Sequence, residues 1–146
     1  MHARQFYIDG AWVEPSGSET LDVIDPSTEE AFETITLGTQ ADVDHAVAAA
    51  RAAFDGFAQV PAKQRLEYLR KLLAAYEARY EEFAQVISRE MGAPITFARE
   101  QQAAAGLGHL QQIVKVMETF QFEHLRGSTR IVKEPVGVVG MITPWN

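Results

Sequence analysis

The chain has 146 residues, which is enough for one domain with a hydrophobic core and too few for two large ones. A hydrophobic fraction of 47% with 23% charged residues is typical of a globular protein and excludes a disordered or fibrous chain. The net charge of −7 argues against nucleic acid or an anionic membrane as the main partner.

The N-terminal residues have the pattern of two β-hairpins. Two short apolar runs flank Asp9-Gly10, a pair that favours a tight turn because both of its positions need positive φ. A second pair of predicted strands, Thr20–Ile24 and Ala31–Leu37, flanks a polar turn. We therefore expect residues 1–38 to be a β-rich segment.

The first helix is predicted to follow Thr39. Its hydroxyl can cap a helix that carries Asp42 three positions later, as in a capping box. An apolar stripe at helical spacing follows, as an amphipathic helix requires: Val43, Ala46, Val47, Ala50 and Phe54.

The second helical stretch lies between Pro61, which suits a first helical position, and Gly92, which suits a helix stop. Its apolar residues recur at alternating steps of three and four: Leu66, Leu69, Leu73, Tyr76, Tyr80, Phe83 and Ile87. This pattern favours a helix hairpin packed on a sheet over a coiled coil, because it spans only three heptads and is capped at both ends.

A third helical stretch is predicted from about Ile95 to Phe120. Gly106 and Gly108 lower the helix propensity in its middle. The apolar residues of its second half share one face: Leu107, Leu110, Val114 and Met117.

Strand patterns return after a turn at Gly127. Thr129–Lys133 and Val136–Ile142 are predicted strands, and Pro135 keeps the first of them at a sheet edge or bend. The second is apolar throughout, as in a strand buried between two neighbours. It leads directly into a final Thr-Pro-Trp-Asn, so we expect the chain to be the opening portion of a larger protein.

Other motifs have no catalytic interpretation. The histidines lack metal-ligand spacing and are predicted surface residues: His2, His45, His109 and His124. The acidic pairs at 29–30 and 81–82 are adjacent residues whose side chains point apart. Gly137 and Gly140 do not complete a dinucleotide fingerprint, because no helix opens on them. The N-terminus lacks an apolar signal core, so we expect a cytoplasmic protein.

Several segments, in this order, resemble the NAD(P)-dependent aldehyde dehydrogenase family. Each corresponds to a family motif, and together they cover nearly all of residues 5–146. They are the opening strand pair (Phe6–Val13), the Asn/Asp-Pro-x-Thr turn (Val23–Thr28), the first alanine-rich helix (Asp42–Phe57), the Glu-x-Gly-Lys-Pro stop (Glu90–Pro94) and the segment entering the cofactor domain (Glu134–Asn146).

The resemblance implies an α/β fold, the N-terminal part of the aldehyde dehydrogenase fold. Its parts would be β-hairpins, a helical layer, an oligomerisation-type strand and the first strand of the Rossmann-like cofactor domain. These correspond to a β-rich segment (1–38), a helical part of the NAD-binding domain (39–125), a strand resembling the oligomerisation segment (126–137) and a truncated start of the cofactor domain with its Pro-Trp-Asn turn (138–146).

The resemblance also implies a mechanism. Family enzymes add a cysteine thiolate to an aldehyde, pass hydride to NAD or NADP, and hydrolyse the thioester with a glutamate-activated water. Asn146 matches the asparagine whose amide stabilises the oxyanion, and is the one catalytic residue implied here. Ile142, Thr143, Pro144 and Trp145 match positions that contact the cofactor. No metal is implied.

The catalytic cysteine and glutamate lie later in the family, and this chain contains no cysteine. We therefore expect these 146 residues alone to lack dehydrogenase activity. The implied partners are a small-molecule aldehyde and, for the full-length protein, further copies in a homodimer or homotetramer; no nucleic acid or membrane is expected.

Two alternatives remain open. The parent could be a CoA-acylating semialdehyde dehydrogenase, which the motifs present do not exclude. The chain could instead be a non-catalytic helical interaction module whose exposed strand pairs with a partner. The aldehyde used and the choice between NAD and NADP are not decided by these residues.

Overall fold

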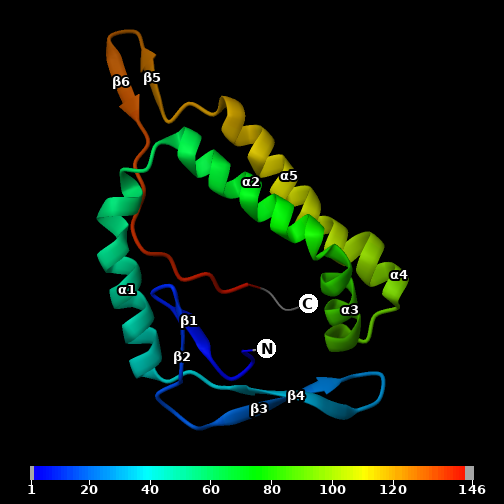
Figure 1. Ribbon diagram of the computed structural model, residues 1–146. Helices are drawn as coiled ribbons and strands as arrows, with labels where there is room; N and C mark the ends of the chain where they lie inside the picture. Colours follow the sequence, from blue (N-terminus) through cyan, green and yellow to red (C-terminus); the bar gives the residue numbers. More distant parts are fainter. Residues whose placement is uncertain (1, 144–146) are drawn as a thin grey trace.

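The computed structural model describes residues 2–143, which form three separate β-hairpins and a set of helices (Figure 1). The hairpins are β1 (Phe6–Ile8) with β2 (Ala11–Val13), β3 (Thr20–Asp25) with β4 (Glu30–Thr36), and β5 (Glu123–Arg126) with β6 (Thr129–Val132). The helices are α1 (Gln40–Ala58), α2 (Ala62–Ala78), α3 (Tyr80–Met91), α4 (Ile95–Phe97), the π-helical η1 (Ala98–Ala103) and α5 (Ala104–Thr119).

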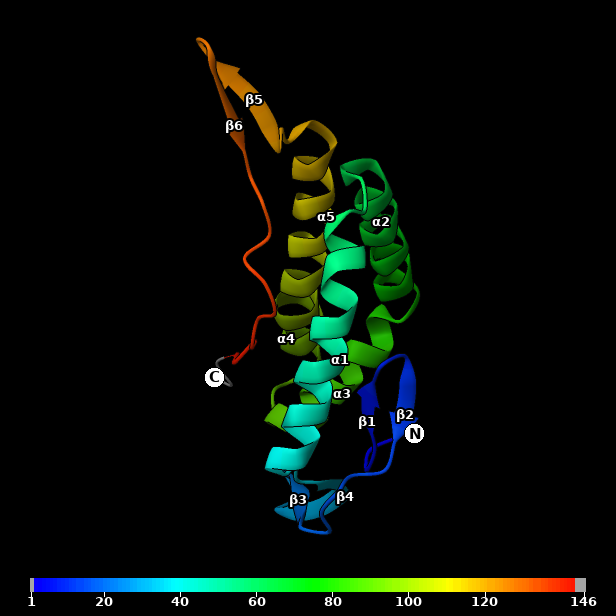
Figure 2. The same ribbon diagram turned by 90° about the vertical axis from the view of Figure 1, so that its left-hand side faces the viewer.

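The β1–β2 hairpin lies between α1 and α3, and the other two hairpins lie at the ends of the molecule (Figure 1). Helices α2 and α5 run side by side in both views, with β3–β4 at one end of the molecule and β5–β6 projecting from the other (Figures 1 and 2). Helix α1 makes a separate limb, linked to α2 by a short turn (Figure 1). In the part of the chain that is described, no helix combines the length and hydrophobicity needed to cross a bilayer.

The two N-terminal hairpins confirm the sequence prediction. At the β1–β2 turn Asp9 and Gly10 have φ of 52° and 78°, the left-handed pair that the Asp-Gly signal indicated. Strands β3 and β4 pair from Thr20↔Thr36 to Asp25↔Glu30, with an irregularity between Val23 and Ile24.

Helix α1 begins with the predicted capping box. The Thr39 hydroxyl accepts a hydrogen bond from the Asp42 backbone N–H (3.4 Å), and the Asp42 carboxylate accepts from the Thr39 backbone N–H (2.8 Å). The same carboxylate accepts from the Ser16 backbone N–H (2.8 Å), so it also fixes the loop before the cap. These hydrogen-bond donors hold the pKa of the Asp42 carboxyl well below its usual range. Asp42 is buried.

The second helical stretch is not continuous, contrary to the periodic pattern. It breaks at Arg79, whose φ of −113° and ψ of 15° leave the helical region between α2 and α3. Across the break the Tyr76 and Phe83 rings stack at 4.4 Å between centroids. The apolar pattern continues across the break because α2 packs against α5 and α3 packs against η1, which precedes α5 in the same helical stretch.

The third stretch is helical over nearly its predicted length, but six of its residues form the π-helix η1 instead of an α-helix. Gly106 lies in α5, and packing explains why a glycine occupies this position, which helix propensity does not. A Cβ built on it would lie 2.5 Å from the Tyr76 hydroxyl oxygen, so only glycine lets α2 and α5 approach this closely here.

The C-terminal third contains one strand that was not predicted and lacks one that was. Residues Glu123–Arg126, for which no strand was predicted, form strand β5. Val136–Ile142, the predicted buried strand, lies in a segment (133–143) with neither helix nor strand. A strand needs a neighbour to satisfy its backbone groups, and no strand in residues 2–143 pairs with this segment.

Few hydrophobic residues are buried, and three of the five are alanines. The buried hydrophobic residues are Ile8, Leu66, Ala84, Ala98 and Ala103, and in the described chain no large side chain is completely buried. Several apolar side chains of α1, among them Val43 and Val47, stay about half exposed. The predicted stripe of α1 therefore exists, but the described residues leave it uncovered.

Candidate functional site

The predicted cofactor and catalytic residues lie at the end of the extended segment that follows β6. The Ile142 side chain is 98% exposed, and Thr143 is exposed as well. Pro144, Trp145 and Asn146 lie outside the described residues, so their predicted roles remain predictions.

The extended segment leaves apolar groups uncovered. Val136 and Met141 are 95% and 88% exposed. At the start of the segment, the Lys133 backbone N–H donates a hydrogen bond to the Phe122 carbonyl oxygen (2.8 Å). Within residues 2–143, no backbone partner satisfies the N–H and C=O groups around Ile142.

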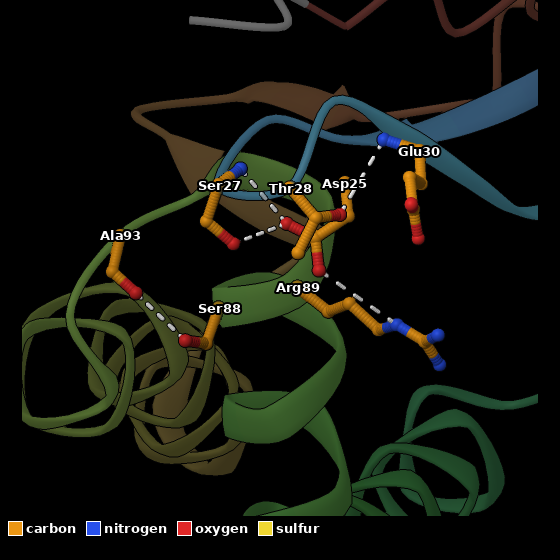
Figure 3. Close-up of polar contacts among 7 residues, drawn as sticks. All are labelled: Asp25, Ser27, Thr28, Glu30, Ser88, Arg89 and Ala93. Atoms are coloured by element: carbon orange, nitrogen blue, oxygen red, sulfur yellow. Dashed lines mark hydrogen bonds and ion pairs between the residues drawn. The ribbon is translucent and has the colours of Figure 1, made fainter.

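The structure brings together two motifs that the sequence had singled out separately. The turn after β3 packs against the end of α3, where Gly92 caps the helix with φ of 71°. A Cβ on Gly92 would lie 3.2 Å from Pro26 Cγ, so the helix stop and the Asp-Pro-Ser-Thr turn are in direct contact. The Ser88 hydroxyl closes this end by donating to the Ala93 carbonyl at 2.7 Å (Figure 3).

Asp25 organises the turn. Its carboxylate accepts from the Ser27 backbone N–H (2.9 Å) and from the Ser27 hydroxyl, and Arg89 Nε lies 4.0 Å from Oδ2 (Figure 3). These Ser27 hydrogen bonds, with a smaller contribution from the Arg89 charge, lower the pKa of Asp25. An ionised carboxylate saturated by local donors suits a structural anchor and not a general base.

A cleft of about 660 Å³ lies beside this junction, between β3–β4 and α3. Its wall includes Phe32, over whose ring the Arg89 guanidinium lies at 4.1 Å from the centroid. Asp25, Glu33 and Glu90 line it too, and its two serine hydroxyls are already engaged, Ser27 with the Asp25 carboxylate and Ser88 with the Ala93 carbonyl. Among residues 2–143 no cluster of His, Asp or Glu could hold a metal ion. The cleft therefore offers no catalytic arrangement.

The second organised polar feature joins α2 and α3 to η1. The Tyr76 hydroxyl donates to the Ala103 carbonyl (3.0 Å), and the Tyr80 hydroxyl donates to the Arg99 carbonyl (2.5 Å). A π-helix widens the i→i−4 ladder and leaves carbonyls open to such donors. Both tyrosines were predicted only as residues of the apolar stripe, although their hydroxyl groups are the signal for these hydrogen bonds.

An ion pair reinforces the same junction. Arg99 donates to both carboxylate oxygens of Glu81 (2.8 and 2.7 Å), a bidentate geometry that fixes η1 to α3. The Arg99 hydrogen bonds lower the pKa of Glu81 to about 2. From the sequence, Glu81 was interpreted only as one of two adjacent residues whose side chains point apart, and its ion pair with Arg99 was not predicted.

Comparison with known proteins gives one consistent result. Residues 12–146 match the sequence model of the aldehyde dehydrogenase family. A 3-succinoylsemialdehyde-pyridine dehydrogenase from a Pseudomonas species is 48% identical over 144 residues, which are 98% of this chain and 30% of that protein. The chain thus spans 30% of the length of this curated relative.

Solved structures of aldehyde dehydrogenases also match this chain. An aldehyde dehydrogenase from Bartonella henselae superposes with a TM-score of 0.83 at 42% identity, covering 86% of this chain and 26% of that one. An aldehyde dehydrogenase C mutant from Pseudomonas syringae, in complex with NAD+ and octanal, gives a TM-score of 0.85 at 38% identity, covering 88% and 27%. These matches confirm the expected α/β fold, the N-terminal part of the aldehyde dehydrogenase fold.

Proposed function

The chain belongs to the aldehyde dehydrogenase family, and from this membership we propose that it is the N-terminal part of an NAD(P)-dependent enzyme that oxidises an aldehyde to a carboxylic acid. The observation that carries the proposal is the family match over residues 12–146, which includes the closing Pro-Trp-Asn. The NAD+ and octanal bound to the similar Pseudomonas syringae protein support the same chemistry.

Asn146 is the residue of this chain proposed to act on the reacting atoms. Its side-chain amide carries two N–H donors and no charge, so it can stabilise a transient alkoxide without attracting an anionic product. Losing one oxyanion donor typically lowers turnover by ~100- to 1,000-fold.

Residues Ile142, Thr143, Pro144 and Trp145 are proposed to contact the dinucleotide, which accepts hydride from the substrate when it is bound. The described part of this segment fits such a role. Ile142 is 98% exposed, and its backbone and apolar side chain are both open to a ligand. Its contribution would be binding and apolar cover, not chemistry.

The nucleophile must come from elsewhere in the polypeptide, because these 146 residues contain no cysteine. We expect the isolated 146-residue chain to reduce no NAD+ with any aldehyde, and a longer protein that carries these residues together with the family's cysteine to do so. NADH absorbance, followed for both proteins under the same conditions, tests this. A measurable rate from the 146-residue chain would contradict the assignment of the chemistry.

The substrate is proposed to be a semialdehyde, on the name of the relative that is 48% identical. A panel containing succinic semialdehyde, an aromatic semialdehyde and octanal would rank the candidates by kcat/KM. Adding CoA to the same reactions distinguishes a CoA-acylating from a hydrolytic dehydrogenase, since the first releases a thioester and the second releases the free acid.

The full-length protein is proposed to form a homodimer or homotetramer in the cytoplasm. The β5–β6 hairpin projects away from the helices (Figure 2), and Leu125 on it is 72% exposed. A projecting two-stranded ribbon has unpaired edges that a second chain can use. Light scattering on the longer protein, before and after Leu125→Lys, would test this contact.

A further inference from the structure

The turn between β1 and β2 places an aspartate and a glycine in a reactive arrangement. Asp9 has φ of 52° and Gly10 has φ of 78°, and both residues are exposed. Within residues 2–143 the Gly10 N–H has no backbone hydrogen-bond partner, and a Cβ built on Gly10 would meet no atom within 4 Å. The Gly10 amide nitrogen is therefore neither held by a backbone hydrogen bond nor shielded by a neighbouring group.

We propose that Asp9 is a modification site, at which the chain closes to a succinimide and then opens to isoaspartate. The Gly10 amide nitrogen attacks Asp9 Cγ, so that a C–N bond forms, a Cγ–O bond breaks, and the hydroxyl leaves as water with the amide proton. Water then opens the ring. Attack at Cγ restores aspartate, whereas attack at the main-chain carbonyl carbon breaks its bond to the Gly10 nitrogen and leaves isoaspartate. The reaction is intramolecular and consumes no reagent except water.

The backbone of the turn is close to the geometry that the ring needs. A five-membered ring holds Cβ and the next amide nitrogen on the same side of the Cα–C bond, which for an L residue sets ψ near about −120°, the value at the first central position of a type II′ turn. That position also has φ of about +60°, and Asp9 already has φ of 52°.

Ring closure therefore requires little more than rotation of the peptide unit between Asp9 and Gly10. The rotation gives Gly10 a negative φ, which glycine adopts as readily as a positive one. Type I′ and type II′ turns both join two-residue hairpins, so the closing pair Ile8↔Ala11 is kept. The succinimide fits the folded hairpin.

A second Asp-Gly pair in the same chain provides a matched comparison. Asp55 and Gly56 are also exposed, and a Cβ on Gly56 would likewise meet no atom within 4 Å. They lie inside α1 (Gln40–Ala58), where ψ is near about −42°. Hydrogen bonds along the helix hold that conformation, so ring closure at Asp55 has to break a helical turn first. The two sites differ in backbone conformation and not in dipeptide.

The product changes the hairpin. Isoaspartate adds one atom to the backbone of the turn, which then no longer has the length of a two-residue loop. The register of β1 and β2 depends on that length, so the modification should weaken their pairing. The site is separate from the residues proposed to act in the dehydrogenase reaction.

Incubation of the 146-residue chain at mildly acidic pH, with and without guanidinium chloride, tests the proposal. Peptide mapping with electron-transfer fragmentation identifies isoaspartate at each position, and circular dichroism of the native sample verifies that the helices remain folded. In guanidinium chloride we expect comparable rates at Asp9 and Asp55. In the native chain Asp9 should react at least about tenfold faster than Asp55, because a helix hydrogen bond no longer opposes ring closure.

Asp9→Asn and Asp55→Asn provide the second measurement. Asparagine keeps the turn preference of the hairpin and loses ammonia in place of water, which makes ring closure faster. Asp9→Asn should accelerate isoaspartate formation at residue 9 both in the native chain and in guanidinium chloride. Asp55→Asn should do so at residue 55 in guanidinium chloride and remain slow in the native chain.

A native rate at Asp9 no higher than that at Asp55 would overturn the proposal. Folding that slows residue 9 as strongly as residue 55 in the asparagine variants would overturn it as well, because the hairpin would then oppose ring closure. Neither result bears on the proposed dehydrogenase function, since no aldehyde or NAD+ enters the experiment.

Discussion

The hydroxyl of Tyr76 donates a 3.0 Å hydrogen bond to the carbonyl oxygen of Ala103, the last residue of η1. Burial raises the pKa of the Tyr76 phenol, so it remains a protonated donor. The contact lies next to Gly106 of α5, where a Cβ would lie 2.5 Å from the Tyr76 hydroxyl oxygen. It connects the side chain of one helix to the irregular backbone of another and thereby fixes the register between them.

Replacing Tyr76 by phenylalanine should destabilise the chain by about 1–2 kcal/mol, because it leaves the Ala103 carbonyl without its donor while the ring packing is kept. Tyr68→Phe is the control, since the Tyr68 hydroxyl is exposed and only accepts a bond from Gln64. Urea unfolding of both variants measures the difference. Equal midpoints would mean that the hydroxyl contributes nothing to the junction.

Gly106→Ala should destabilise by about 1–3 kcal/mol, because the new methyl would lie 2.5 Å from the Tyr76 hydroxyl and force α2 and α5 apart. Gly108→Ala, two residues along the same helix, meets no atom within 4 Å and should stabilise by up to about 1 kcal/mol. Thermal unfolding of the two variants should therefore show opposite signs. Two shifts of the same sign would refute the close-approach explanation of Gly106.

Acid should weaken the junction between α3 and η1. The pKa of Glu81 is lowered to about 2 by Arg99, so its contribution to stability is complete above the ordinary value of 4.5 and is lost as the pH falls toward 2. Glu81→Gln should lower the free energy of unfolding at neutral pH. It should also reduce the dependence of that free energy on pH between about 4.5 and about 2. Glu82→Gln, on the same turn and paired with Arg79, is the control.

High salt should reduce the difference between Glu81→Gln and the parent chain, because the pair is partly exposed and screened. Urea unfolding from pH 7 to pH 3 gives the slope. An unchanged slope in Glu81→Gln would show that another carboxylate dominates acid unfolding.

The cap of α1 offers a fourth test. Thr39→Ala should cost about 1 kcal/mol by removing the side-chain acceptor of the capping box, whereas Thr39→Ser keeps that hydroxyl and should cost much less. Because α1 makes few other contacts, amide exchange in its first turn should accelerate in the alanine variant only. Equal exchange in both variants would assign the stability of α1 to its packing instead.

The sequence predicted those elements whose cause is local. The Asp9-Gly10 turn, the Thr39–Asp42 capping box and the Gly92 stop all depend on φ preferences or on side chains three residues apart, and the structure contains each of them. The break at Arg79 escaped prediction because it preserves the apolar period. The π-helix escaped because its partners, Tyr76 and Tyr80, lie about twenty residues or more away along the chain.

The family was predictable from the sequence, whereas the roles of the site residues remain predictions. The closing motif indicated the family, and the comparisons confirm that membership. The strand predicted for Val136–Ile142 rested on its apolar composition, whereas strand formation requires a paired neighbour that residues 2–143 do not supply.

The measurement that tests the central claim most directly is the turnover of a full-length protein carrying these residues, with and without Asn146→Ala. If Asn146 donates to the oxyanion, kcat should fall by ~100- to 1,000-fold while the Kd for NAD+ changes little. Thr39→Ser provides a control for general effects of substitution in this segment of the protein. An Asn146→Ala enzyme that turns over its aldehyde at the parent rate would contradict the account.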